Sequence, residues 1–172
     1  MLRRDPLANP EALIRRVYSY VAYRIGDGPD AEDVTSETFE RALRYRASFD
    51  ARKGEPTSWL IGIARRCIAD AVTRPVEARE EQETAESSDL AEDTVRRLSI
   101  RSGLAELDER SAELIALRYG ADLSARQIGV LLDMQPNAVD VALHRALGRL
   151  RAILETEPDD QALPVAREAR SS

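Results

Sequence analysis

Cysteine, histidine and aromatic residues are scarce in this chain. Its 172 residues include one cysteine, Cys67, one histidine, His144, and only 5% aromatic residues. A single cysteine excludes a disulfide within the chain, and a single histidine leaves no His/Cys cluster to hold a metal. The sequence also has no glycine-rich phosphate loop and no Ser/His/Asp set, and its carboxylates are scattered over the faces of the predicted helices. We therefore expect no cofactor and no enzyme activity, with an unrecognised type of enzyme as the remaining alternative.

Long hydrophobic runs are absent as well. No stretch approaches the roughly 18 consecutive apolar residues of a membrane span. The N-terminal residues Met1–Pro6 lack the apolar centre of a signal peptide. We therefore expect a cytoplasmic protein with no membrane insertion.

The net charge of −6 is concentrated in two segments. Residues 75–92 hold 7 acidic and 1 basic side chains, and residues 156–172 hold 4 and 2. Residues 1–74 hold 13 basic and 11 acidic side chains, and residues 93–155 hold 9 of each. The two near-neutral parts can separate their charges onto faces. Affinity of the free chain for DNA should still be weak, because sequence-independent affinity comes mainly from phosphate neutralisation.

Helical periodicity covers most of the chain, and strand alternation is absent. In the first part, the apolar spacing predicts helices over residues 10–25, 31–46 and 56–74. Asp30 is expected to cap the second of these helices. Cys67 lies on the apolar face of the third, where it is expected to be a small buried hydrophobe. These helices form a first predicted domain, residues 1–74.

Residues 75–92 are too acidic and too poor in large apolar side chains to bury a core, so they are expected to form a flexible linker. Residues 156–172 are expected to be a disordered tail. Between them the pattern predicts a second helical domain over 93–155, with helices near 93–107, 109–119, 124–132 and 136–154.

The last two predicted helices have the pattern of a helix-turn-helix. Ser124 and Gln127 are placed to form a capping box. Residues 133–135 make the break, and Pro136 suits a first helical position because its missing N–H would be unpaired there. From Val139 the apolar residues follow one stripe. The opposite face could enter a DNA major groove, and a helical hairpin with a solvated face is the alternative.

The predicted fold class is therefore all-α. Two small helical domains are joined by an acidic flexible linker, and the C-terminal domain is a helix-turn-helix.

Three segments together resemble the extracytoplasmic-function, or group IV, sigma factors of bacterial RNA polymerase, in the sigma-70 superfamily. Residues 30–43, DAEDVTSETFERAL, resemble the family's polymerase-binding helix. Residues 57–66, TSWLIGIARR, resemble its promoter-melting helix, and residues 123–150 resemble the region that reads the −35 element. The resemblance implies an alternative sigma factor, which is a dissociable specificity subunit with no catalysis of its own. It directs promoter-specific initiation of transcription.

The resemblance also implies how the chain contacts core polymerase. In the family the helix that residues 30–43 resemble binds the coiled coil of the largest-subunit clamp, and the second domain lies near the flap. A row of acids on a helix can meet a basic partner and set the encounter rate. The alternative is that the acids stabilise the positive N-terminal end of the helix. That explains Glu32 and Asp33 but not Glu37 and Glu40, which lie further along the helix. The expected contact residues are Asp33, Ser36, Glu37 and Glu40, with Ser36 standing where glutamine is usual.

For the −10 element, the resemblance implies capture of unstacked bases by loop 47–55 and the helix that follows. Such capture needs positive charge and stacking faces. The register of Trp59 with Ile63 and Cys67 favours a core position over a DNA-facing one. The candidate −10 residues are Tyr45, Phe49, Arg52, Lys53, Arg65, Arg66 and Arg74.

For the −35 element, the helix over residues 124–132 is expected to lie over the DNA backbone, and the helix over residues 136–154 is expected to enter the major groove. Asp140 departs from the family pattern: phosphates repel it, but it can accept a hydrogen bond from a cytosine amino group. We favour weakened −35 affinity over a changed −35 preference. His144 has no second ligand at helical spacing and is expected at the surface. The candidate residues are Ser124, Arg126, Gln127, Asn137, Ala138, Asp140, Val141, His144, Arg145, Arg149 and Arg151.

The expected partners are core RNA polymerase, promoter DNA and an anti-sigma factor that holds the chain inactive until a stress or envelope signal. Two other classes stay open on the residues. A stand-alone helix-turn-helix regulator would bind palindromic duplex DNA without polymerase. A helical adaptor would bind only protein. Asp140 is the residue that best supports this alternative, because DNA phosphates repel its charge.

Overall fold

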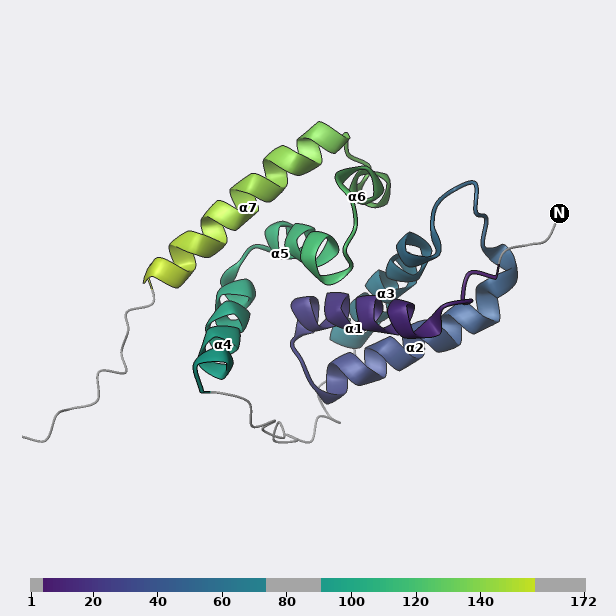
Figure 1. Cartoon of the computed structure of the whole chain (residues 1–172), viewed down its shortest axis with the longest axis horizontal. Helices are drawn as coiled ribbons and strands as arrows, with labels where there is room; N and C mark the ends of the chain where they lie inside the picture. Colours follow the sequence, from purple (N-terminus) through teal and green to yellow (C-terminus); the bar gives the residue numbers. More distant parts are fainter. Residues whose placement is uncertain (1–4, 74–90, 157–172) are drawn as a thin grey trace, which may run out of the picture.

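The computed structural model describes residues 5–73 and 91–156, which contain helices and no strand (Figure 1). A 3-10 turn, Arg46–Ser48, follows α2, and a π-helical segment, Ala116–Gly120, continues α5. The all-α prediction is confirmed. The helices are α1 (Pro10–Ile25), α2 (Pro29–Tyr45), α3 (Pro56–Thr73), α4 (Ala91–Glu106), α5 (Glu109–Ile115), α6 (Ala125–Leu132) and α7 (Pro136–Thr156).

Proline stands at the start of four helices, where its missing N–H costs no intrahelical hydrogen bond. The predicted cap at Asp30 is wrong. Helix α2 has Gly28 in the cap position, so Asp30 lies inside its first turn. An acid there still suits the positive end of the helix. The four prolines are Pro10, Pro29, Pro56 and Pro136.

Helices α1, α2 and α3 pack together around a shared apolar core. Cys67 is fully buried there, as predicted, and burial raises the pKa of its thiol. Arg41 ties α2 to α3, because its guanidinium donates to Glu37 on its own helix and to Asp70 on α3. Those hydrogen bonds raise the pKa of Arg41. Helix α2 is thus held firmly on α3.

Helix α7 forms the long outer edge of the second part and packs on α4, α5 and α6 (Figure 1). Its buried stripe is Val139, Leu143 and Ala146, as the apolar spacing predicts. Asp108 caps α5 by accepting a hydrogen bond from the Ser111 N–H at 3.0 Å. Among the described residues, no helix combines the length and apolar character needed to span a bilayer.

The two parts of the chain contact each other directly. Helix α5 and the π-helical segment pack on α1, and α6 approaches α3. Figure 1 shows α5 lying between α7 and α1. As a result, buried residues from both parts form one continuous core. The predicted flexible linker and tail fall almost wholly on residues 74–90 and 157–172, outside the described residues.

Candidate nucleic-acid interface

The acidic face of α2 lies largely open to solvent. Asp33, Ser36 and Glu40 are exposed, while Glu37 is half-buried and paired with Arg41. Because that pair also involves Asp70, the orientation of Glu37 depends on α3. The four residues predicted to contact polymerase thus lie on one helix. Among them, Glu37 is held in place by its ion pair with Arg41.

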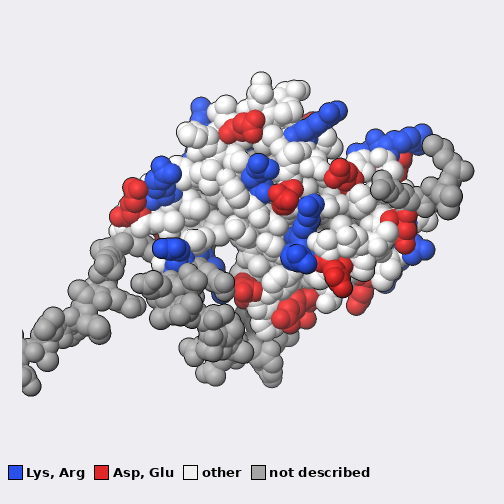
Figure 2. All heavy atoms as spheres, in the orientation of Figure 1, with Lys and Arg blue, Asp and Glu red and all other residues white. Residues whose placement is uncertain are grey.

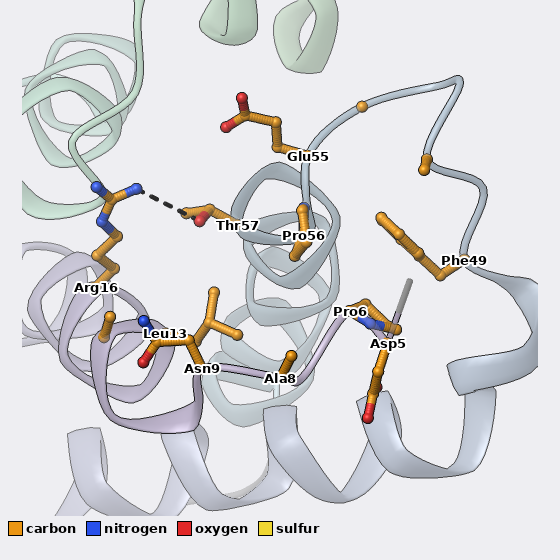
Figure 3. Close-up of a pocket in the computed structure, with 13 residues that line it drawn as sticks. Asp5, Pro6, Ala8, Asn9, Leu13, Arg16, Phe49, Glu55, Pro56 and Thr57 are labelled. Carbon is orange, nitrogen blue, oxygen red and sulfur yellow. Dashed lines mark hydrogen bonds between the residues drawn. The ribbon is translucent and has the colours of Figure 1, made fainter. Parts of the chain in front are cut away.

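A cavity of about 510 Å³ lies between the N-terminal end of α1 and the loop that precedes α3 (Figure 3). Its walls come from Asp5 and Leu13 on one side and from Phe49, Pro56 and Thr57 on the other. The volume is large enough for a nucleobase-sized group, and the lining mixes apolar and polar side chains, as ligand pockets do. The cavity borders Phe49 of the predicted −10 residues.

Two aromatic side chains define one wall of this region. Phe49 lines the cavity, and its ring packs on Trp59 with centroids 5.5 Å apart. Trp59 is partly buried against the core, which fits the position that its register favours. Tyr45, the second predicted stacking group, is exposed at the end of α2.

The basic side chains predicted to contact the −10 element differ in their surroundings. Arg52 is exposed and pairs with Asp50, an interaction that raises the pKa of Arg52 and lowers that of Asp50. Lys53 and Arg66 are exposed. Arg65 instead faces the second part of the chain, where its Nε lies 2.9 Å from Glu113 Oε1. Arg74 lies outside the described residues.

The predicted capping box at the start of α6 is confirmed. The Gln127 N–H donates to Ser124 Oγ at 3.3 Å, and the Ser124 N–H donates to Gln127 Oε1 at 2.8 Å. Arg126 is exposed beside them. Gln127 also reaches the first part of the chain, because its Nε2 donates to Glu55 Oε2 at 3.0 Å.

The turn between α6 and α7 is fixed by backbone contacts. Asp133 ends α6 in the left-handed conformation (φ 54°), and the Met134 N–H donates to the Gly129 carbonyl at 2.8 Å. A Cβ on Gly129 would lie 2.5 Å from the Met134 carbonyl oxygen. The sharp break therefore needs glycine at position 129, and it sets the angle at which α7 leaves.

The outward face of α7 is exposed along its whole length. Arg149 differs from the rest, since its NH1 lies 2.9 Å from Asp108 Oδ2 and 2.9 Å from Ser111 Oγ, which ties α7 to α5. Within residues 5–73 and 91–156, no three His, Cys, Asp or Glu side chains lie close enough together to hold a metal ion. His144 therefore belongs to no such group there. The exposed residues are Asn137, Ala138, Asp140, Val141, His144, Arg145, Arg149 and Arg151.

Charge on the visible face of the molecule is mixed. In Figure 2, arginine and acidic side chains are interspersed over the helices. A face of mixed charge has little long-range attraction for a phosphate backbone.

Sequence reasoning missed a set of contacts between the two parts of the chain. Tyr20, Arg24 and Arg65 converge on the buried carboxylate of Glu113, and Gly120 lies against the backbone of Tyr20. One signal was present in the sequence. Glu113 is the one charged side chain in an otherwise apolar or small run, residues 111–117.

Comparison with known proteins finds two family models that match successive parts of the chain. The sequence model of Sigma-70 region 2 matches residues 11–76, and that of Sigma-70, region 4 matches residues 97–150. A similar protein is the ECF RNA polymerase sigma factor BldN of Streptomyces coelicolor, 29% identical over 155 residues, which cover 84% of this chain and 57% of BldN. Another is SigK of Mycobacterium ulcerans, 28% identical, with 81% of this chain and 80% of SigK covered.

Two solved structures share the fold. CnrH in complex with the cytosolic domain of CnrY superposes with a TM-score of 0.58 at 23% identity, over 86% of this chain and 83% of CnrH. RpoE in complex with the anti-sigma factor NepR, from Bartonella quintana, gives 0.60 at 17% identity, over 84% and 93%.

The fold and the helix-turn-helix define an all-helical protein of the transcription-factor class. The two matched models, which together cover more than half of the chain, are successive regions of one family. The chain belongs to the sigma-70 family, in its extracytoplasmic-function group. It spans 57% of the length of BldN.

Proposed function

We propose that the chain is an alternative sigma factor that binds core RNA polymerase and directs initiation at a specific set of promoters. One observation carries the proposal: matches to sigma-70 regions 2 and 4 follow one another along the chain. The proposed division is 1–74 for polymerase and the −10 element, 75–92 for the linker, 93–155 for the −35 element and 156–172 for the tail. In this role the chain performs no catalysis, and it acts in the cytoplasm, where polymerase and promoter DNA lie.

The −35 element would be read by α7. Its exposed face supports this assignment, because base edges in the major groove are contacted by side chains along such a recognition helix. Arg145 and Arg151 are exposed cations placed for bases or flanking phosphates. Arg149 would act by holding α7 on α5, since it is bonded to Asp108. Ser124, Arg126 and Gln127 would lie over the DNA backbone at the N-terminus of α6, where N–H groups favour phosphate.

The −10 element would be captured as a single strand. The 510 Å³ cavity supports this role, because a base removed from the stack needs an enclosing site and an apolar or aromatic face. Phe49 supplies the face, and the exposed cations Arg52, Lys53 and Arg66 supply charge for the backbone. Tyr45 lies further out, at the end of α2.

The polymerase would be held through α2. Asp33, Ser36, Glu37 and Glu40 present an acidic face suited to a basic partner, and such complementarity sets encounter rate and register. The largest-subunit clamp is the proposed partner for this face and the flap for the second domain. An anti-sigma factor is the proposed inhibitor, supported by the RpoE structure, which is a complex with one.

A DNA-binding experiment with and without polymerase tests this function. We expect purified chain alone to give weak binding to duplex promoter fragments, and chain plus core polymerase to give a specific, heparin-resistant complex. Tight binding of the free chain to a palindromic duplex, with no gain from polymerase, would instead identify a stand-alone regulator. Glu40→Lys should weaken the polymerase-dependent complex, while Glu11→Lys, an exposed acid on α1, is the matched control.

A further inference from the structure

The short segment that precedes α1, residues 5–9, is folded against the first part of the chain. The Leu7 N–H donates to Asp5 Oδ1 at 3.1 Å, and the Ala8 N–H donates to the Asp5 carbonyl at 3.3 Å. Pro6 is buried, and Leu7 packs against the apolar core. We call residues 5–9 the N-terminal segment. Its contacts make it an ordered part of the fold.

An ion pair links the N-terminal segment to the end of α2. Arg46, in the 3-10 turn after α2, has its NH1 3.8 Å from Asp5 Oδ2. The two side chains are 56% and 48% exposed, so the pair contributes little to stability by itself. Together with the hydrogen bond to the Leu7 N–H, the pair holds the segment beside the turn that leads directly to Phe49.

This placement makes the N-terminal segment one wall of the 510 Å³ cavity, with Phe49 and Pro56 on the other side (Figure 3). A base that stacks on Phe49 is therefore enclosed by the segment as well as by the −10 loop. The model of Sigma-70 region 2 matches residues 11–76, so the segment lies outside the part that the family model covers. The lining residues of the segment are Asp5, Pro6, Ala8 and Asn9.

Asn9 is the residue of the N-terminal segment best suited to contact a base. It stands at the N-cap of α1, where an Asn side chain normally accepts a hydrogen bond from the first turn of the helix. The Asn9 side chain makes no such bond, and it is exposed and lines the cavity. A side-chain amide presents a donor beside an acceptor, which matches a base edge such as N6 and N7 of adenine. The Asn9 amide is therefore available to a base in the cavity.

From these contacts we infer that the N-terminal segment completes the −10 pocket and that Asn9 is a specificity-determining residue for the base held there. The inference rests on the proposed sigma-factor function, and the ligand is one unstacked base of the single-stranded −10 element. Phe49 provides a stacking face that every base can use, whereas the Asn9 amide distinguishes between base edges. Asp5 is a positioning residue, because its contacts to the Leu7 N–H and to Arg46 hold the segment in place.

Two unlike variants test the pocket. Asn9→Ala removes the amide, and Ala8→Trp fills the cavity from the side of the N-terminal segment while Phe49 and Asn9 stay in place. The matched controls are both at Glu11, an exposed residue in the first turn of α1 that does not line the cavity. Glu11→Ala controls for the loss of a polar side chain, and Glu11→Trp controls for added bulk.

Base discrimination is measured by competition binding to the complex of the chain with core RNA polymerase. The competitors are fork-junction templates from a promoter that the wild-type chain uses, with each of the four bases placed in turn at each single-stranded −10 position. Asn9→Ala should reduce the preference at one of these positions by at least about fivefold, the lower end for one bidentate contact, and should leave the others unchanged. Both Glu11 variants should behave as wild type.

Asp5 is tested by a pair of variants in the same assay. Asp5→Ala should reduce the preference at the position that depends on Asn9, because the N-terminal segment is no longer held. Asp5→Asn keeps an acceptor for the Leu7 N–H and should restore most of that preference. A folded Asp5→Ala chain with the full wild-type preference would show that Asp5 does not position the segment.

Ala8→Trp should weaken binding to all the fork-junction templates, while gel filtration shows unchanged binding to core polymerase. If Ala8→Trp does not fold, Asn9→Ala decides the question alone, because it removes an exposed side chain that makes no cap hydrogen bond. Unchanged preferences in Asn9→Ala, equal loss for all four bases, or wild-type template binding by folded Ala8→Trp would overturn the inference. A wild-type chain that forms no polymerase complex, or that prefers no base at any −10 position, would count against the sigma function itself.

Discussion

Gly129 should be irreplaceable in the turn that aims α7. A Cβ at this position would lie 2.5 Å from the Met134 carbonyl oxygen, 3.5 Å from Met134 C and 3.8 Å from Pro136 N. All three are backbone atoms, and the turn is further fixed by the Met134 N–H bonded to the Gly129 carbonyl at 2.8 Å. The turn therefore cannot yield without tilting α7.

The expected cost of Gly129→Ala follows from two opposed effects. Overpacking costs about 1–3 kcal/mol, and the better helix propensity of alanine returns about 1 kcal/mol. We expect a net loss of up to about 2 kcal/mol in the free energy of unfolding. For a chain of this size that corresponds to a fall in Tm of up to about 8 °C.

Gly148→Ala is the matched control, because a Cβ at position 148 on α7 meets nothing within 4 Å. It should raise the free energy of unfolding by about 0.5–1 kcal/mol. Thermal unfolding followed by circular dichroism compares the two variants. If Gly129→Ala proves as stable as Gly148→Ala, the packing argument for the turn is refuted.

Three further predictions concern aspartates. Asp133→Gly should raise the free energy of unfolding by about 0.5–1 kcal/mol, since Asp133 ends α6 with a φ of 54°; a lower Tm would contradict this. Hydrogen bonds from Ser111 lower the pKa of Asp108 in the folded chain, so its stabilisation is present above the unfolded pKa and is lost as pH falls below about 4. The Tm gap between wild type and Asp108→Asn should therefore narrow in that range, and a constant gap would exclude a role for the charge. Asp140→Lys should strengthen binding of the polymerase complex to a −35 fragment and steepen its salt dependence by about one counterion. Weaker binding would show that Asp140 reads a base.

Local features of this fold follow well from the sequence. The helix-turn-helix was predictable because its signals are short-range: the Ser124–Gln127 capping box, Pro136 at the start of α7 and the apolar stripe from Val139 all act within a few residues. The one wrong cap, Asp30, arose because Pro29 can itself open a helix, which moves the cap back to Gly28.

The contacts between the two parts were not predictable in the same way. Glu113 and Tyr20 are 93 residues apart, and no periodicity links them. Arg65 was assigned to DNA because it lies in a matching motif, and its position opposite Glu113 depends on how the helices dock. Gly120 gives no turn signal, since its role is to let α1 approach. Such features depend on tertiary packing, and only the structure reveals them.

Promoter-specific transcription is the most direct test of the account. The purified chain is mixed with core RNA polymerase, the complex is isolated by gel filtration, and the peak is assayed for run-off from genomic promoter fragments. The account predicts a stable complex that starts transcription at defined sites, which core polymerase alone does not use. Failure to form a complex, together with tight binding of DNA by the free chain, would contradict it.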